Sequence, residues 1–261
     1  MVMEINKVIK STSNQQVKEW KKLKAKKERV KQNKYVLEGW HLVKEAMQAN
    51  EIIETLLITP EFKYIDEIEL TDEEIEVIEI YPEIAKQLSD TPSPQGIFAI
   101  VLIQKELEVN PALVDGAWLL LDRVQDPGNI GTMVRTADAA GFAGVIFGDG
   151  SADIYQPKVV RAMQGSQFHI KLISGDLIPW IEAFKEKSYP IFGSELNEKA
   201  RPYDQVGRHQ NFALIMGNEG NGMAKQHLEQ TSLNLYIPIK GRAESLNVAV
   251  AAGILMFQLH E

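Results

Sequence analysis

The chain contains no cysteine, and that absence excludes several kinds of chemistry. Disulfides, thiolate metal sites and cysteine nucleophiles all require a thiol. Residues 1–7 lack the charged and then apolar layout of a secretory signal peptide. No apolar run approaches the roughly 20 residues that are needed to span a bilayer. We therefore expect a cytoplasmic protein with no membrane partner.

Two widespread nucleotide-binding signatures are missing as well. A Walker loop requires glycine and lysine followed by serine or threonine, and the chain has no such run. A dinucleotide-binding loop requires G-x-G-x-x-G, whereas residues 217–222 read G-x-x-G-x-G and place Glu219 where its charge would oppose a pyrophosphate. The five histidines show no ligand-like spacing, so we expect no metal site.

Charged residues are unevenly distributed along a chain whose net charge is −8. Between Lys7 and Lys34, ten lysines and one arginine stand against two glutamates, whereas twelve acids and one lysine lie between Glu51 and Glu83. A local excess matters more to a polyanion than the total charge does. The densest basic cluster comprises Lys21, Lys22, Lys24, Lys26 and Lys27. This basic cluster is either a solvated helix face or an arm that contacts phosphates in a salt-dependent manner.

The first hundred residues combine short helix and strand signals. Asn14 is placed to cap a basic helix that extends through Lys31. Apolar stretches at 35–39, 52–58, 76–81 and 97–103 indicate strands. Because a polar segment follows at 104–116, we expect a first domain at 1–103, a linker at 104–116 and a second domain at 117–261.

Residues 117–261 alternate regularly between apolar strands and helical segments. The candidate strands are Ala117–Leu121, Gly144–Phe147, Phe168–Leu172, Tyr189–Phe192, Phe212–Met216 and Leu233–Ile237. Short, almost purely apolar strands that are joined by helices are typical of a parallel sheet covered on both faces. The sequence therefore predicts an α/β domain. Its last helix runs to Leu259, and Ser245 is placed to cap the start of that helix.

Three polar segments follow apolar runs in the last quarter of the chain: 217–222 (GNEGNG), 237–241 (IPIKG) and 245–247 (SLN). In α/β sheets, ligands bind in the crevice at the carboxyl ends of the strands. Glycines let the backbone approach a ligand closely. These segments are therefore either the walls of one binding site or glycine-rich turns and a helix cap without a ligand.

A fourth polar segment, 122–131 (DRVQDPGNIG), follows the first strand of the second domain and leads into a helix that carries Arg135. Arg123, Asn129 and Arg135 are expected near the carboxyl end of one strand. Arginine offers forked donors to phosphate, so this cluster favours an anionic substrate. The alternative is a capped turn beside a surface arginine.

These residues together resemble the SpoU (TrmH-type) family of RNA ribose 2′-O-methyltransferases, within the SPOUT superfamily. The segment 126–131 with Arg135 looks like the first family motif, 216–222 like the second, and 237–239 with 245–251 like the third. The combination, in this order and spacing, is highly specific. The segments 36–39 (VLEG) and 94–97 (PQGI) resemble the RNA-substrate-binding domain of the family with less specificity.

The resemblance implies a fold and partners that residue patterns do not show. It implies a trefoil knot at the carboxyl end of the catalytic domain, an exception to the rule that chains avoid knots. It implies S-adenosylmethionine bound in the knot and contacted by Gly217, Ile237 and Leu246. It also implies a homodimer with the knot at the interface, and an RNA substrate that is ribosomal rather than transfer RNA.

The resemblance also implies a set of catalytic residues: Arg135, Asn129, Glu219, Ser245 and Asn247. An arginine keeps its proton at neutral pH, so we expect Arg135 to grip phosphate and stabilise a developing alkoxide rather than act as the base. The remaining four residues would orient Arg135 and the ribose. The rival hypothesis is a non-catalytic, dimeric RNA-binding protein that uses the same fold.

Overall fold

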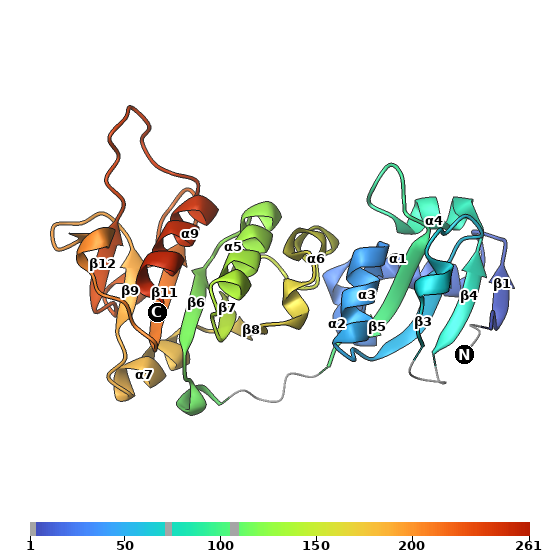
Figure 1. Cartoon of the computed structure of the whole chain (residues 1–261), viewed down its shortest axis with the longest axis horizontal. Helices are drawn as coiled ribbons and strands as arrows, with labels where there is room; N and C mark the ends of the chain where they lie inside the picture. Colours follow the sequence, from blue (N-terminus) through green and yellow to red (C-terminus); the bar gives the residue numbers. More distant parts are fainter. Residues whose placement is uncertain (1–3, 71–74, 105–109) are drawn as a thin grey trace. The chain divides into compact units, whose positions relative to one another are not determined.

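The chain forms two compact units in its computed structural model, which describes residues 4–70, 75–104 and 110–261 (Figure 1). The first unit takes in residues 1–105 together with Tyr155–Phe168, and the second takes in 106–154 and 169–261. Residues 105–109 of the expected linker lie outside the described residues, so the linker at 104–116 stays a prediction.

The first unit is built on a five-stranded mixed sheet with the order β1-β4-β3-β5-β2. Its strands are β1 (Lys7–Ile9), β2 (Lys34–Glu38), β3 (Ile53–Ile58), β4 (Glu76–Ile80) and β5 (Ile97–Leu102). Strand β4 pairs in parallel with β1 and β3, whereas β5 pairs antiparallel with β2 and β3. The sequence indicated all of these strands except β1, which is too short to show a period.

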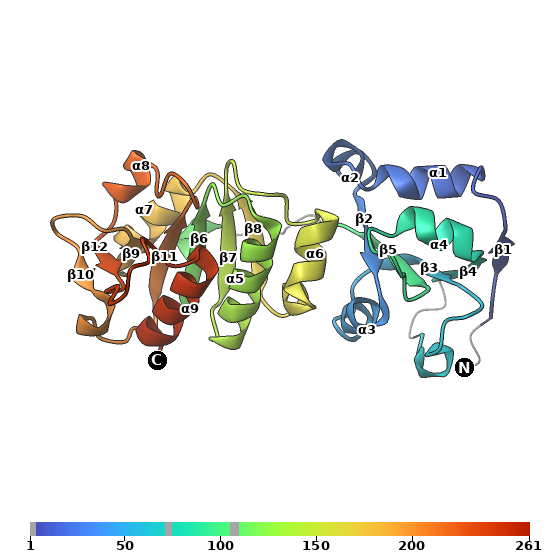
Figure 2. The same ribbon diagram turned by 90° about the horizontal axis from the view of Figure 1, so that it is seen from above.

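Helices cover both faces of this first sheet (Figure 2). They are α1 (Gln15–Lys22), α2 (Lys26–Gln32), α3 (Trp40–Gln48), α4 (Pro82–Leu88) and the 3₁₀ turn Ile65–Glu67. Helices α1 and α4 pack on one face, where Val17, Trp20 and Ile84 join a single apolar core with the strands. Helix α3 covers the opposite face with its buried residues Leu42 and Val43.

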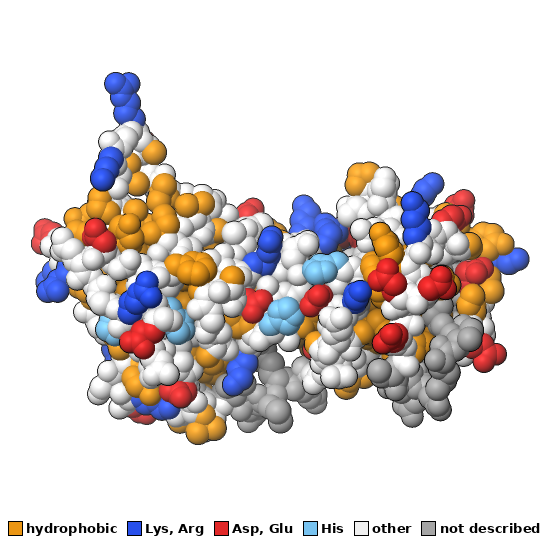
Figure 3. Space-filling view, viewed as in Figure 1, with side chains coloured by type: hydrophobic (Ala, Val, Ile, Leu, Met, Phe, Trp, Pro, Cys, Tyr) orange, Lys and Arg blue, Asp and Glu red, His pale blue; other side chains and the backbone are white. Residues whose placement is uncertain are grey.

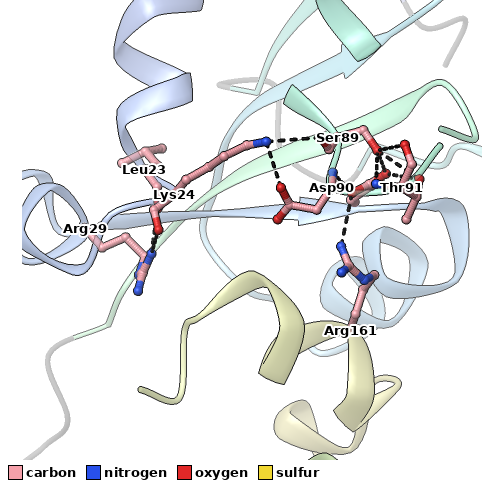
Figure 4. Close-up of polar contacts among 8 residues, drawn as sticks. Leu23, Lys24, Arg29, Ser89, Asp90, Thr91 and Arg161 are labelled. Atoms are coloured by element: carbon pink, nitrogen blue, oxygen red, sulfur yellow. Dashed lines mark hydrogen bonds and ion pairs between the residues drawn. The ribbon is translucent and has the colours of Figure 1, made fainter. Parts of the chain in front are cut away.

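The basic segment forms two helices rather than the one helix that was expected through Lys31. Asn14 caps α1 as predicted, because its side chain accepts a hydrogen bond from the amide of Gln16. The helix ends after Lys22, and Leu23 is buried in the core. The buried guanidinium of Arg29 donates to the carbonyls of Leu23 and Lys24, both at 2.8 Å (Figure 4). These bonds satisfy carbonyls that a continuous helix would otherwise use.

The segment Tyr155–Phe168 lies between two strands of the second sheet in sequence but belongs to the first unit in the structure. It holds α6 (Pro157–Met163) and a 3₁₀ turn at Ser166–Phe168. Its Tyr155 ring packs 4.9 Å from that of Tyr35, and its Arg161 lies 3.6 Å from the carboxylate of Glu38. This segment groups with the first unit because α6 contacts β2, and the expected second domain at 117–261 stays a prediction.

The second unit is built on a seven-stranded sheet with the order β10-β12-β9-β11-β6-β7-β8, and every pairing is parallel. Its strands are β6 (Ala117–Asp122), β7 (Gly144–Gly148), β8 (Lys171–Gly175), β9 (Ile191–Ser194), β10 (Arg201–Pro202), β11 (Phe212–Gly217) and β12 (Leu233–Tyr236). The predicted parallel α/β sheet is confirmed. Strand β8 begins three residues later than expected, and β10 was not predicted because two residues carry no period.

Helices again cover both faces of this second sheet. They are α5 (Pro127–Ala139), α7 (Ile178–Glu186), α8 (Lys225–Leu228) and α9 (Val248–Leu259), with 3₁₀ turns at Pro111–Leu113 and Tyr203–Gln205. Helices α5 and α9 lie side by side on one face, and α7 lies on the other (Figures 1 and 2). Every residue of β6, β7 and β11 is buried, which explains why these strands are apolar throughout.

The pairing of β6 with β11 brings the polar segments that follow these two strands side by side. In register, Gly217 stands opposite Asp122 at the carboxyl ends of the two strands. Strand β6 has β7, the next strand in sequence, on one side and β11 on the other. This is the kind of switch in strand order at which open α/β sheets bind ligands.

The buried carboxylate of Asp122 ties the end of β6 to the segment that follows β11. Asp122 is only 1% exposed, and it accepts hydrogen bonds from the amide of Ala224 and from Nε of Arg123. Nδ1 of His227 lies 3.0 Å from the same carboxylate. Burial alone would raise the pKa of Asp122, but these three partners together hold it below its usual value.

A second set of contacts fixes the segment 218–222 itself. The side chain of Asn218 donates to the carbonyl of Arg123 at 2.9 Å and accepts from the amides of Gly220 and Asn221 at 3.0 Å. Asn218 and Gly222 also exchange backbone hydrogen bonds. A Cβ at Gly217 would lie 2.5 Å from the backbone of Gly222 and Met223, so only glycine fits at this position.

We expect Asp122→Asn to lower the free energy of unfolding at pH 7 by about 3 kcal/mol, because a buried carboxylate that holds cationic and amide donors is lost. A carboxylate whose pKa is lowered by folding stabilises the protein above its unfolded pKa, near 3.8, and loses that effect as the pH falls through the folded value. Denaturant unfolding of both proteins should therefore show a difference at pH 7 that shrinks below pH ~4. An equal difference at both pH values would contradict this role.

Candidate active site

Three side chains from separate polar segments form one hydrogen-bonded chain at the carboxyl edge of the second sheet. Nδ2 of Asn129 donates to Oε1 of Glu219 at 3.2 Å. Nδ2 of Asn247 donates to Oδ1 of Asn129 at 2.9 Å. Asn129 and Glu219 are 90 positions apart in sequence, and Asn129 and Asn247 are 118 positions apart. The fold alone brings them together.

The first turn of α5 places Asn129 in this chain. Asp126 caps the helix by accepting from the amide of Asn129 at 2.8 Å, and Pro127 supplies a favourable first residue. Glu219 also accepts from the amides of Gln125 and Asp126, at 3.5 and 3.2 Å. The Asp-Pro pair thus starts the helix, while Glu219 binds the turn that leads into it.

Glu219 is held in its ionised form by its surroundings. Its partial burial would raise its pKa, but the hydrogen bonds from its own amide, from Asn129 and from the amides of Asp126 and Gln125 outweigh burial and lower it. At neutral pH the side chain is therefore a carboxylate that accepts hydrogen bonds. It can orient amides and hydroxyl groups, and it cannot donate a proton.

Asn247, and not Ser245, caps the last helix. The Asn247 side chain accepts from the amides of Ala249 and Val250 at 2.9 and 3.3 Å, and α9 begins at Val248. The expectation for Ser245 was wrong because the cap and the helix start lie two residues later. Ser245 and Leu246 lie instead in the exposed segment before the helix. Asn247 thereby links the helix start to Asn129.

Arg135 is exposed on α5, one and a half turns after Asn129. Among residues 4–70, 75–104 and 110–261, it makes no hydrogen bond or ion pair with the Asn129–Glu219–Asn247 chain or with any other side chain. The structure therefore brings three of the five expected catalytic residues into direct contact. Arg135 and Ser245 are exposed, the first on α5 and the second in the segment before α9.

A pocket of about 550 Å³ lies where the segment 237–247 leaves β12 and returns to α9. This volume is in the range of small-molecule and cofactor sites. Ile237, Ser245 and Leu246 line the pocket, as do the carboxylate-bearing residues Glu195 and Glu244. Gly217 is not among the lining residues, and its role in the structure is to permit the tight 217–222 turn.

Sequence reasoning missed two acidic residues of this pocket. Glu195 follows β9, and β9 pairs with both β11 and β12. A search of every strand end, rather than of the glycine-rich ones alone, would have found it. Glu244 lies one position before the third motif. Both carboxylates suit a ligand that carries positive charge.

Figure 3 shows apolar side chains gathered around the base of the 237–247 segment, with lysine and arginine side chains at its tip. Exposed apolar residues in this region include Leu196, Ile239, Leu246 and Val250. Contiguous exposed apolar surface is uncommon on monomers and marks ligand or partner sites.

The basic cluster in the first unit is accessible, but several of its ammonium groups already have protein partners. Lys22 binds Glu19 at 2.8 Å, and Lys21 donates to Gln87 at 2.9 Å. Lys24 binds Asp90 at 2.8 Å and the carbonyl of Ser89 at 3.1 Å (Figure 4). Each of the five lysines, Lys21, Lys22, Lys24, Lys26 and Lys27, is exposed.

A metal centre and a membrane span were also sought in the parts of the chain that the structure describes. No group of three or more His, Asp or Glu residues is arranged there to hold a metal ion. None of the helices in those parts is both long and apolar enough to cross a membrane.

Comparison with known proteins assigns both units. Residues 116–257 match the model of the SpoU rRNA Methylase family, and residues 14–99 match the MRM3-like substrate binding domain. The chain is 42% identical over 253 residues to the 23S rRNA (guanosine(2553)-2′-O)-methyltransferase RlmP of Bacillus subtilis, covering 97% of this chain and 99% of that protein.

Solved structures agree with this assignment. The AdoMet-bound rRNA methyltransferase of Sinorhizobium meliloti superposes with a TM-score of 0.85 at 28% identity, covering 96% of each chain. The SpoU methyltransferase AviRb of Streptomyces viridochromogenes, in complex with AdoMet, gives 0.83 at 25% identity, covering 94% of this chain and 96% of that chain. The match to the family model, the identity to RlmP and the shared fold show that this chain belongs to the SpoU family of S-adenosylmethionine-dependent RNA 2′-O-methyltransferases.

Proposed function

We propose that this enzyme methylates the ribose 2′-hydroxyl of a guanosine in 23S ribosomal RNA, within the cytoplasm. The observation that carries the proposal is the Asn129–Glu219–Asn247 chain beside a pocket of cofactor size. The guanosine assignment rests on the activity of the RlmP relative, which matches almost the whole chain.

The pocket beside α9 is the proposed cofactor site. S-adenosylmethionine supplies a methyl group that its sulfonium centre activates for displacement. Ile237 and Leu246 would hold it through the walls of the pocket, and the carboxylates of Glu195 and Glu244 match its positive charge. Gly217 would act from the neighbouring turn, where its backbone lies against Gly222 and Met223.

Arg135 is the proposed catalytic residue. Methyl transfer to a ribose hydroxyl needs the hydroxyl aligned with the methyl group and its developing negative charge stabilised. The guanidinium of Arg135 is exposed and has no protein partner among the described residues, so it is available to a phosphate and to the ribose oxygen. Asn129, Glu219, Ser245 and Asn247 would orient Arg135 and the ribose from the adjoining segments.

A non-catalytic RNA-binding role is the weaker hypothesis. A module that only binds RNA has no use for a pocket of about 550 Å³ whose lining includes the carboxylate-bearing Glu195 and Glu244. The family match, in which relatives are solved with AdoMet, supports the enzyme.

A carboxyl-terminal trefoil knot is part of the proposal. Two features support it: β12 lies beyond β9 and away from β11, and the chain then returns so that Asn247 bonds to Asn129 in the first turn of α5, the helix that follows β6. The segment 237–247 therefore crosses back over strand ends that precede it in sequence.

A homodimer through α9 is the other structural part of the proposal. This helix is apolar on all sides, yet Val250 and Phe257 are 52% and 57% exposed, and they lie on one face at helical spacing. A helix that is apolar all round is normally buried. A second copy, related by a two-fold axis, would cover this face with the same face of its own α9.

We expect Arg135→Ala to abolish ribose methylation while leaving S-adenosylmethionine affinity within about two-fold, because Arg135 does not line the cofactor pocket. The measurement uses cells that lack the protein and are complemented by wild type or by the variant. Mapping ribose methylation across their total RNA identifies the methylated nucleotide and shows whether the variant loses that methylation. Calorimetry with S-adenosylmethionine is the control. Wild-type methylation by the variant would remove Arg135 from the catalytic residues.

Phe257→Glu should convert the dimer into monomers, because it places a charge on each side of the proposed apolar interface. Sedimentation measures the mass in solution. Leu113→Glu is the matched control, since Leu113 is 75% exposed in the second unit and lies away from α9. A Phe257→Glu protein with unchanged mass would contradict this interface.

Neutralising Lys21, Lys22, Lys24, Lys26 and Lys27 to glutamine should weaken RNA binding and flatten its salt dependence. Each phosphate contact that is lost reduces the slope of log K against log salt by about 1. The exposed Lys225 of the second unit provides a control substitution. An unchanged slope would show that the basic cluster is only a solvated face.

A further inference from the structure

A second pocket, of about 490 Å³, opens in the first unit between the 89–96 loop, the start of α4 and the segment that follows β3. Tyr64, Lys63, Lys86, Glu61 and Ser93 are among its lining residues. None of the motif residues of the methyltransferase unit takes part in it. Its volume suits a ligand of the size of a nucleobase with its sugar.

An aromatic platform forms one wall. The ring of Tyr64 lies parallel to that of Trp40, with centroids 6.4 Å apart and an angle of 9° between their planes. Phe62 packs edge-on against both rings. Trp40 and Phe62 are buried, whereas Tyr64 stays 46% exposed. The two buried rings therefore hold Tyr64 in place and leave part of its ring available for stacking.

The opposite wall is the 89–96 loop, which is fixed before any ligand arrives. Glu38 accepts from the hydroxyls of Ser89 and Thr91, and its carboxylate also lies 3.6 Å from Arg161 (Figure 4). At the other end of the loop, Oε1 of Gln95 accepts from the amide of Trp40 at 2.8 Å. Pro92 and Pro94 restrict the backbone between these anchors.

The charged groups around the pocket suit a base with flanking phosphates better than a bare phosphate. Lys63 and Lys86 stand at the pocket with Glu61, and further acids, Asp66 and Glu67, follow in the adjacent turn. A free anion in the pocket would meet the carboxylate of Glu61, whereas Glu67 in the adjacent turn is already paired with Lys44 at 3.2 Å. A nucleobase is neutral, and only its two neighbouring phosphates need cations.

The pocket also adjoins the basic cluster. Lys86 lies on α4, and the next residue, Gln87, accepts from Lys21 of α1. Asp90, which follows α4, binds Lys24. A strand of RNA on the basic cluster would therefore reach the pocket across α4.

We propose that this pocket binds one unpaired nucleobase of the RNA substrate, stacked on Tyr64, with its flanking phosphates at Lys63 and Lys86. Sequence-tolerant recognition of single strands works through such stacking. The inference deepens the proposed function, since the ligand is a part of its RNA. Glu61 favours bases with an exocyclic amino group over uracil, because the single N3–H donor of uracil lies between two carbonyl oxygens that repel a carboxylate.

The test uses the full-length protein and an eight-nucleotide unstructured RNA that carries one 2-aminopurine, whose fluorescence is quenched on stacking. Wild type and Tyr64→Phe should quench the probe with similar affinity, because both keep the ring. Tyr64→Ala should weaken binding by roughly 5- to 150-fold, since one stacked base contributes about 1–3 kcal/mol. Unchanged affinity and quenching in Tyr64→Ala would overturn the proposal.

Ile65→Ala is the matched control, because the neighbouring side chain is 39% exposed and does not line the pocket. It should bind like wild type, and an equal loss in both alanine variants would overturn the stacking role. Competition with otherwise identical RNAs should favour cytosine over uracil at the probe position, and Glu61→Gln should reduce this preference. No preference in wild type would refute the role of Glu61.

Methyl transfer separates this proposal from the proposed function. In a titration with RNA, Tyr64→Ala should raise the KM for RNA and keep the kcat that is reached at saturation. A failure of the proposed function would instead leave wild type without methyl transfer. The probe would still report on the pocket in that case. A variant that loses kcat and keeps KM would overturn the assignment of Tyr64 to RNA binding.

Discussion

The site depends on one buried carboxylate at the end of a strand. Asp122 closes β6 and holds the chain that follows β11 through Ala224 and His227, and it also accepts from its own neighbour Arg123. A buried carboxylate without donors would be costly, so the position of the later segment is fixed by the need to satisfy it. The 218–222 turn is thereby fixed, and with it the carboxylate of Glu219. The first and second motifs thus act as a unit.

The third motif is held more lightly. The segment 237–247 is largely exposed and joins the rest through Asn247, which binds Asn129 on one side and caps α9 on the other. Its apolar residues Ile239 and Leu246 face solvent in a single copy of the chain, as do Val250 and Phe257 of α9. A cofactor in the pocket and a second protomer on α9 would cover these surfaces, so cofactor binding and dimerisation are expected to stabilise the same segment.

The two units divide recognition and chemistry. The first unit carries the basic cluster, the aromatic wall at Tyr64 and the loop pinned by Glu38, all of which suit RNA. The second carries the hydrogen-bonded chain and the pocket that we propose for the cofactor. The net charge of −8 hides this division, because the acidic stretch of the first unit offsets its lysines in the sum.

The sequence by itself determined the parallel α/β sheet, since short apolar strands between helices have no other way to bury both faces. The family resemblance of its motifs also named Asn129, Glu219 and Asn247, which the structure joins by hydrogen bonds. Only the tertiary structure decided that Asn247 rather than Ser245 caps α9, and that Arg29 divides the basic segment into two helices. The pairing of Asp122 with Ala224 and the stacking of Tyr64 on Trp40 likewise join residues that are distant in sequence. Local patterns fix the type of each element, whereas contacts between distant segments depend on how the elements pack.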